Sequence, residues 1–117
     1  MKTKALLNAI ALISMGWSFS AQADCPFPKA PDTIPDGNTA AEAEMIEAMR
    51  AFKAYNEEVK AFQTCLDEET KARSASGGSS MSFKTMQSKK LAAAFDELES
   101  KAEKFNEQVR IFKARGS

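Results

Sequence analysis

The stretch from Thr39 to Leu66 limits what this chain can fold into more than any other. Its apolar residues alternate in spacing between three and four positions: Met45, Ala48, Phe52, Tyr55, Val59, Phe62 and Leu66. This alternation places them all on one face of an α-helix. The pattern therefore predicts a long amphipathic helix over residues 39–74, whose apolar stripe needs a packing partner.

A second stripe with the same alternation follows a Gly/Ser-rich segment at 75–81, which is a flexible linker by composition. Its members are Leu91, Phe95, Leu98, Ala102, Phe105, Val109 and Phe112, with Phe83 and Met86 extending it toward the linker. These residues predict a second helix over 82–114. Two long stripes joined by a short loop predict an all-α fold, an antiparallel, coiled-coil-like two-helix hairpin.

The position of the bend sets the pairing between the two stripes. A bend near Gly77-Gly78 brings Phe62 to the level of Leu91 to Phe95. The same bend brings Met45 to the level of Val109 to Phe112. At the other end, Thr39 followed by Glu42 has the spacing of a capping box, so we expect the first helix to begin there.

Residues 1–23 have the features of a cleaved secretory signal peptide. Lys2 and Lys4 precede an apolar stretch of roughly 15 residues, and the segment ends in Ala21-Gln22-Ala23. A spanning helix needs about 20 apolar residues, which argues against an uncleaved anchor. Because Asp24 directly precedes Cys25, lipid attachment at that cysteine is also disfavoured. We expect cleavage between Ala23 and Asp24, and a mature chain without a membrane span.

The mature chain, 24–117, is one small domain that opens with a Pro-rich strap at 24–38. All four prolines of the chain lie in this strap, which predicts extended, polyproline-like backbone. In an exported chain, two cysteines predict a disulfide, Cys25–Cys65. The alternative is two free thiols, one of them binding a metal. It lacks further ligands because the chain has no histidine.

The disulfide constrains the path of the strap. Ala40 to Cys65 spans about 37 Å of helix at a rise of about 1.5 Å, and the strap reaches about 43 Å at the polyproline rise. The bond is therefore feasible only if the chain turns at Pro35 to Gly37 and runs back along the first helix. Phe27 and Ile34 are the expected apolar contacts of the strap.

The charge pattern argues against a nucleic-acid partner. The whole chain has 16 basic and 16 acidic residues, so removing Lys2 and Lys4 leaves 14 against 16, with no concentrated basic patch. The charges are nevertheless divided: residues 24–69 have a net charge of −7 and residues 70–117 of +5. This division favours pairing of the two halves within one chain, unless it reflects ordinary solvated helix faces.

The sequence offers little for catalysis, and we expect no enzymatic activity and no cofactor. The absence of histidine removes the commonest general base. The acidic runs Glu57-Glu58 and Asp67-Glu68-Glu69 fan around a helix instead of converging, as on a solvated face. Two methionine pairs, Met45/Met49 and Met81/Met86, have thioethers that could hold cuprous copper, but such side chains more often fill a core.

One segment of the first helix has a near copy in the second. Residues 55–62, Tyr-Asn-Glu-Glu-Val-Lys-Ala-Phe, resemble residues 105–112, Phe-Asn-Glu-Gln-Val-Arg-Ile-Phe. The similarity indicates either a duplicated helix or surface, or the convergence of helical heptads on a common pattern.

The motifs of the mature chain resemble a family of small secreted proteins of proteobacteria. The residues that carry the resemblance are Cys25-Pro26-x-Pro28, Pro31, Ile34-Pro35-Asp36-Gly37, Ala40, Met45, Tyr55-Asn56, Cys65-Leu66, Phe105-Asn106-Glu107-Gln108-Val109-Arg110 and Phe112-Lys113-Ala114-Arg115. The Gly-Gly-Ser linker is not among them. The resemblance implies a periplasmic helical hairpin and adds no mechanism.

These patterns together predict a non-catalytic periplasmic or secreted protein that binds an as yet unidentified protein partner in the periplasm. The expected role is an adaptor or a structural component of the cell envelope. The alternative is a chaperone-like holder of unfolded clients, which would use a partly exposed Met- and Phe-rich stripe. Two helices bury little apolar surface, so either the strap completes the core or two hairpins pair into a four-helix homodimer.

Overall fold

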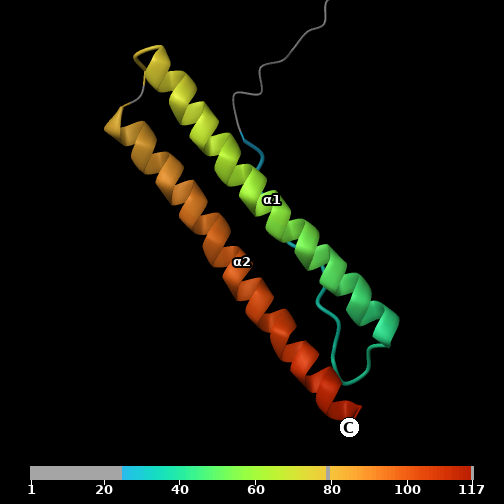
Figure 1. Ribbon diagram of the computed structural model, residues 1–117. Coiled ribbons are helices and arrows are strands. Elements are labelled where there is room, and N and C mark those ends of the chain that lie inside the picture. The colour runs from blue at the N-terminus through green and yellow to red at the C-terminus, as the bar shows by residue number, and fades with distance from the viewer. Residues whose placement is uncertain (1–24, 79, 117) are drawn as a thin grey trace, which may run out of the picture.

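The computed structural model describes residues 25–78 and 80–116; the predicted signal segment 1–23 and the Ala23–Asp24 cleavage site lie outside this range. Two helices, α1 (Glu42–Ala75) and α2 (Met81–Arg115), run antiparallel beside each other along their whole length (Figure 1). An extended strap precedes α1, and the described residues contain no strand. The predicted fold class, an all-α hairpin with a Pro-rich strap, is confirmed.

The apolar stripe of α1 faces α2 as the spacing predicts. The buried members are Met45, Phe52, Tyr55, Val59, Phe62 and Leu66, and Ala48 is half-buried beside them. Tyr55 and Val59 are almost completely buried, with 2% and 1% of their surface exposed. These two residues mark the centre of the helix contact.

The stripe of α2 follows the prediction in part: Phe105 is buried, and four further members pack partly buried against the core, namely Leu91, Leu98, Val109 and Phe112. Its buried members are Phe83, Gln87, Ala94 and Phe105, whereas Phe95 and Met86 are 42% and 49% exposed. Ala94 is fully buried because a small side chain lets the bulky residues of α1 approach α2 closely. The prediction rested on the alternating spacing of apolar residues, and this pattern placed Phe95 and Met86 on the contact face although both are exposed.

Three contacts fix the register of the hairpin. The Phe52 ring stacks on the Phe105 ring with centroids 4.8 Å apart, and the Arg73 guanidinium lies 4.1 Å from the centroid of the Phe83 ring. Between these levels the Gln87 side chain donates to the Leu66 carbonyl oxygen at 3.4 Å. This register places Phe62 at the level of Leu91 to Phe95, in agreement with the bend near Gly77-Gly78.

Hydrogen bonds order the end of α1 at the hairpin bend. The Gly77 amide donates to the Ser74 carbonyl at 3.1 Å and the Gly78 amide to the Arg73 carbonyl at 2.8 Å. With Gly77 at φ +76°, this is a Schellman motif. The two helices also each extend one residue into the predicted 75–81 linker. The glycines therefore terminate α1 in a defined way, which composition alone did not indicate.

The predicted capping box at Thr39 and Glu42 is wrong, and the cap lies two residues later. The Thr39 and Ala40 amides both donate to the Asp36 carbonyl, at 3.1 Å and 2.8 Å. Since this turn holds the chain through Ala40, α1 begins only after Ala41. The Glu44 carboxylate accepts from the Ala41 amide at 2.8 Å, which is the reaching-back half of a capping box.

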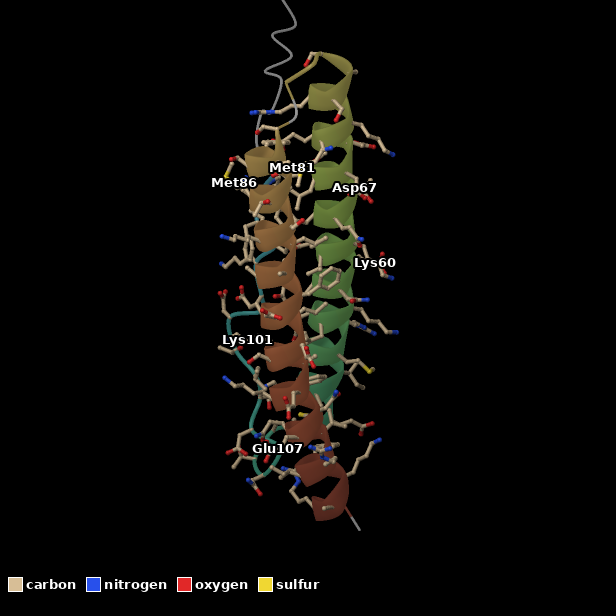
Figure 2. All side chains as sticks on the ribbon, turned by 90° about the vertical axis from the view of Figure 1, so that its left-hand side faces the viewer. Lys60, Asp67, Met81, Met86, Lys101 and Glu107 are labelled. Carbon is tan, nitrogen blue, oxygen red and sulfur yellow. A yellow bond between two sulfur atoms is a disulfide. The ribbon has the colours of Figure 1, made fainter. Side chains whose placement is uncertain are left out.

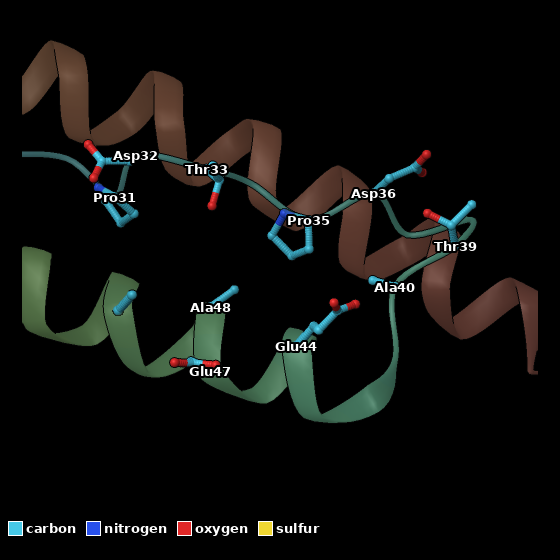
Figure 3. A pocket seen from close by; sticks show the side chains of 11 residues that line it. Pro31, Asp32, Thr33, Pro35, Asp36, Thr39, Ala40, Glu44, Glu47 and Ala48 are labelled. Atoms are coloured by element: carbon cyan, nitrogen blue, oxygen red, sulfur yellow. The ribbon is translucent and has the colours of Figure 1, made fainter.

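The strap forms a third layer on the hairpin. The predicted Cys25–Cys65 disulfide is present and joins residues 40 apart in sequence, with Cα atoms 5.8 Å apart. The Phe27 ring meets the Phe62 ring edge-on, with centroids 5.4 Å apart, and Ile34 packs against the core as predicted. The strap does not follow α1 alone, however. It lies on one face of the hairpin, over the groove between the two helices, and contacts both of them (Figures 1 and 3).

The far end of the strap lies directly on the backbone of α2. The Gly37 amide donates to the Gln108 side-chain oxygen at 2.8 Å, and Gly37 is buried. A Cβ atom on Gly37 would overlap the Gln108 carbonyl oxygen and lie 2.9 Å from the Phe112 amide nitrogen. Gly37 has no positive φ, so this position needs glycine for space and not for backbone conformation.

Arg115, the last residue of α2, holds the turn from the other side. Its guanidinium donates to the Asn38 carbonyl at 2.8 Å and to the Ala40 carbonyl at 2.7 Å. The guanidinium also lies 4.8 Å from the centroid of the Phe112 ring. The strap is thus fixed at both ends, covalently to α1 and by close packing and hydrogen bonds to α2.

We expect Gly37→Ala to destabilise the fold by about 1–3 kcal/mol, because the added methyl group must displace the α2 backbone or the strap. Urea unfolding followed by circular dichroism measures the effect. Gly116→Ala is the matched control, since its Cβ would meet nothing closer than 3.8 Å. Equal stability of the two variants would contradict the close approach of Gly37 to α2.

Candidate functional site: the two faces of the hairpin

The strap covers one of the two broad faces of the hairpin. In Figure 2 the strap passes on the side where Lys101 and Glu107 project, and Lys60 and Asp67 project on the opposite side. We call the covered side the strap face and the opposite side the open face. The two faces differ in chemistry and are described in turn.

An acidic hollow lies on the strap face between the strap and α1 (Figure 3). Its volume is about 590 Å³, and carboxylates line it from both sides: Asp32 and Asp36 from the strap, and Glu44 and Glu47 from α1. Among the described residues, no group of three or more Cys, Asp or Glu side chains is placed to hold a metal ion. The hollow is therefore a solvated acidic edge.

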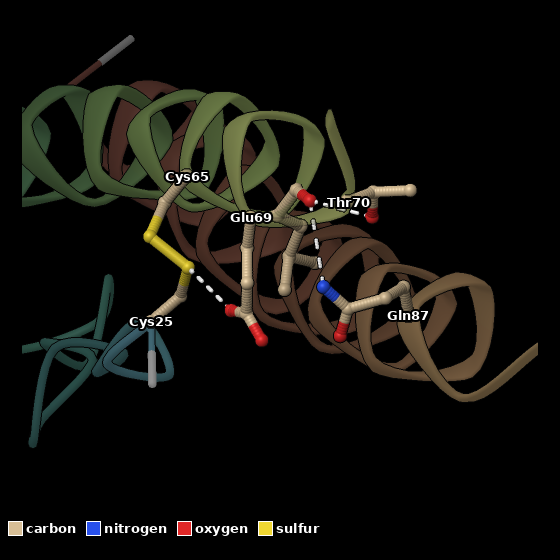
Figure 4. The surroundings of a disulfide bond; sticks show 6 residues. Cys25, Cys65, Glu69, Thr70 and Gln87 are labelled. Carbon is tan, nitrogen blue, oxygen red and sulfur yellow. Dashed lines mark hydrogen bonds between the residues drawn. A yellow bond between two sulfur atoms is a disulfide. The ribbon is translucent and has the colours of Figure 1, made fainter. Parts of the chain in front are cut away.

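The disulfide lies at the edge of the strap face (Figure 4). Both cysteines are half-buried, and a hollow of about 500 Å³ opens beside them. A Glu69 carboxylate oxygen lies 3.5 Å from the Cys25 sulfur. Because a disulfide sulfur carries no proton, this is a van der Waals contact, and the bond between the cysteines is left partly open to solvent.

Tyr55 is the most perturbed titratable group of the hairpin core. Its hydroxyl is buried and has no hydrogen-bond partner among the described residues. Burial raises the pKa of Tyr55 above 10.0, and the negative charges of Glu97 and Glu58 raise it further. The phenol is thus held neutral. The apolar stripe predicted Tyr55 as core, but nothing in the sequence indicated an unpartnered hydroxyl.

The open face contains a hollow that no strap residue lines. It lies between the helices near the bend, has a volume of about 290 Å³, and is lined by Leu66, Asp67, Thr70, Lys71, Lys84, Gln87, Ser88 and Leu91. The Gln87 side-chain oxygen there is buried without a hydrogen-bond partner among the described residues. The hollow identifies which residues of each helix face away from the strap.

Two rows of residues extend from this hollow along the open face. On α1, Thr70 is preceded at intervals of seven by Gln63, Asn56 and Met49. On α2, Leu91 is followed at intervals of four, three and four by Phe95, Leu98 and Ala102. Met49 is 47% and Phe95 42% exposed. The open face is therefore apolar along α2 and mostly polar along α1.

The α2 row was part of the single stripe that the sequence predicts for the second helix. In the structure this stripe divides: Phe105 is buried against α1, and Phe95 turns to the open face. The stripe is wider than the contact between the two helices. The extra width of the apolar stripe on α2 was visible in the sequence. It could be interpreted only once the face covered by the strap was known.

The remaining candidates do not form sites. In the antiparallel hairpin Met45 and Met49 lie at one end and Met81 and Met86 at the other, so the two methionine pairs do not meet. The acidic runs at 57–58 and 67–69 are exposed, except for the half-buried Glu69 beside the disulfide.

The similar segments 55–62 and 105–112 have the same packing role. Their aromatic and valine positions all face inward: Tyr55, Val59 and Phe62 in α1, and Phe105, Val109 and Phe112 in α2. Because Phe105 stacks on Phe52, the two segments lie at different levels of the hairpin and do not face each other. A shared packing role is consistent with the convergence of helical heptads at these inward positions.

No helix formed by the described residues is apolar over a length that could cross a bilayer. The comparisons with known proteins give no match: no protein-family model, no curated protein and no solved structure is significantly similar to the chain. The two faces of the hairpin are therefore the basis for proposing a function.

We expect the absorbance titration of Tyr55 near 295 nm to have a midpoint above pH 10, because burial and nearby carboxylates disfavour the phenolate. The chain has one tyrosine, so the signal is unambiguous. In urea the midpoint should return to about 10. Because only the phenolate is disfavoured in the folded state, the fold keeps its full stability below pH 10 and loses stability as the pH rises through the folded pKa.

Tyr55→Phe is the matched control for this titration. It removes the signal together with a buried hydroxyl that has no partner, so we expect the free energy of unfolding at pH 7 to be unchanged or increased. A midpoint at or below pH 10 in the folded protein, or a marked loss of stability in Tyr55→Phe, would contradict the buried, unpartnered hydroxyl.

Proposed function

We propose that this protein is a non-catalytic periplasmic component that binds another polypeptide through its open face, as an adaptor or structural element of the cell envelope. The single observation that carries the proposal is the surplus apolar row on α2. Leu91, Phe95, Leu98 and Ala102 have the spacing of a helix-packing stripe. Leu91 and Leu98 pack partly buried against the core, whereas Phe95 is left 42% exposed.

The location in an oxidising compartment rests on two observations. The disulfide between Cys25 and Cys65 is typical of exported proteins, and residues 1–23 have the pattern of a signal peptide. The proposal of a non-catalytic role rests on the chemistry of the chain. There is no histidine, and the perturbed tyrosine is held in its neutral form away from solvent.

Specific binding fits the open face better than the general holding of unfolded clients. A chaperone-like holder needs a broad exposed apolar surface. Here the exposed large apolar side chains are distributed over the molecule: Met81 near the bend, Met86 on the strap side, Ile46 and Met49 near the opposite end, Phe27 on the strap and Phe95 on the open face. One row with regular helical spacing favours a helix of defined sequence as the partner.

Photo-crosslinking in cells tests the proposal. The photoreactive residue p-benzoylphenylalanine replaces Phe95 in one variant of the full chain and Met86 in the matched control. Both positions lie on α2 and are similarly exposed, but Met86 lies on the strap side (Figure 2). We expect one dominant crosslinked product from position 95 and none from position 86, identified by mass spectrometry.

Each pattern of crosslinked products has a distinct meaning. No product from position 95, or equal products from both positions, would contradict binding through the open face. Many products from position 95 would favour a chaperone-like holder over an adaptor.

A further inference from the structure

We propose that the polypeptide bound by the open face is a second copy of this chain, so that two hairpins pair face to face into an antiparallel four-helix bundle. This inference rests on the proposed function and names the partner of that same face. Three properties of the open face support it: its size, the symmetry of its two rows, and the strap on the opposite face.

The open face is large enough for a stable dimer. Helices of 34 and 35 residues are roughly 50 Å long at a rise of about 1.5 Å per residue. Two helices side by side, each about 10 Å wide with its side chains, therefore present a face of roughly 1,000 Å². A standard stable interface buries about 800 Å² on each partner, so one face can supply a complete interface.

The midpoints of the two rows of the open face lie at the same level of the hairpin. The row Met49, Asn56, Gln63 and Thr70 is centred between residues 59 and 60, and the row Leu91, Phe95, Leu98 and Ala102 between residues 96 and 97. The contacts of Phe52 with Phe105 and of Arg73 with Phe83 place these two centres at the same level of the hairpin.

One twofold axis, perpendicular to the helices and parallel to the open face, therefore passes through both centres. It places each helix antiparallel to its own copy. An interface built on a single twofold axis is closed and contains every contact twice, as in most homodimers.

The same axis pairs residues of matching chemistry on α2. Leu91 meets the partner's Ala102, and Phe95 meets the partner's Leu98. All of these contacts are between apolar side chains, and the small Ala102 at each end of the row leaves room for the partner's Leu91. The centre of the apolar row is thereby covered on both copies, including the exposed part of Phe95.

On α1 the axis pairs polar residues. Asn56 meets the partner's Gln63, and two side-chain amides can both donate and accept. Asp67 comes within about one residue of the level of the partner's Lys53, which brings opposite charges near each other. Lys60 meets its own copy near the axis, but its charge is offset by Glu57, whose carboxylate oxygen lies 3.2 Å from the Lys60 ammonium.

The strap makes the assembly closed. Residues 25–40 cover the opposite face of each hairpin, so that face cannot add a third copy in the same way. Each chain then has one free face, which the second copy fills. A dimer is the expected end point, and not a filament.

Sedimentation equilibrium of the exported, disulfide-bonded protein tests the inference. The protein concentration is varied over about 5–100 µM, the range in which a dimer of moderate affinity dissociates. We expect the mass of two chains. Phe95→Glu places a charge at the centre of the interface and should weaken the dimer by roughly 30-fold or more. Met86→Glu is the matched control and should sediment like the unchanged protein, and circular dichroism checks that both variants keep their helices.

A mixture of ¹⁵N-labelled and unlabelled protein, each with the photoreactive residue at position 95, tests the arrangement of the two copies. We expect crosslinks between a labelled and an unlabelled copy of the tryptic peptide 91–101, which contains Leu98. A crosslink to an α1 peptide of the other copy would overturn the antiparallel pairing of α2 with itself.

The inference of a dimer would be overturned if the protein sediments with the mass of one chain up to about 100 µM. It would also be overturned if Phe95→Glu and Met86→Glu dissociate equally. If position 95 then still crosslinks to one other protein in cells, the proposed function holds and only the identity of the partner is wrong. If position 95 crosslinks to nothing, both proposals fail.

Discussion

The close approach of Gly37 to the backbone of α2 is the constraint on which the rest of the structure depends. Only glycine leaves room for the strap to touch the helix where Gln108 accepts its amide hydrogen bond. This contact fixes the turn at Asp36 to Ala40, and the turn determines where α1 begins. The contact of Gly37 with α2 also holds the strap over the groove between the helices, so that one face of the hairpin is covered and the other is left open.

The disulfide complements this contact at the other end of the strap. A cross-link between residues 40 apart is worth about 4 kcal/mol in the chain-entropy model. That contribution matters in a small domain, where a two-helix core buries little apolar surface. Because the strap is attached to α1 by a covalent bond and to α2 by packing, it ties together two helices that share a single line of contact.

The sequence was sufficient for the large features of the fold. The alternating spacing predicted both helices, and the cysteine pair with the length of the strap predicted the disulfide and the turn. The prediction failed where small or polar residues determine packing. Ala94 and Gln87 are buried on α2 because they fit against the bulky residues of α1, a property that hydrophobic periodicity does not register.

Gly37 and the open face show a second limit of sequence-based prediction. Pro-Asp-Gly-Asn predicted a turn but not that the turn lies on another helix, since close approach depends on what lies opposite. Similarly, the row from Leu91 to Ala102 was predicted as core. Within this row only Phe95 is exposed, and its exposure became interpretable only when the strap was placed on the opposite side, which is a property of the tertiary structure.

Amide hydrogen exchange of Gly37, followed by NMR, tests the docking of the strap on α2 most directly. This amide lies in an irregular segment, and in the described part of the chain it donates to the Gln108 side-chain oxygen. If the strap is docked as described, the Gly37 amide exchanges slowly, on the time scale of the core amides of α1. Exchange at the rate of an unfolded chain, while the α1 amides stay protected, would contradict the account.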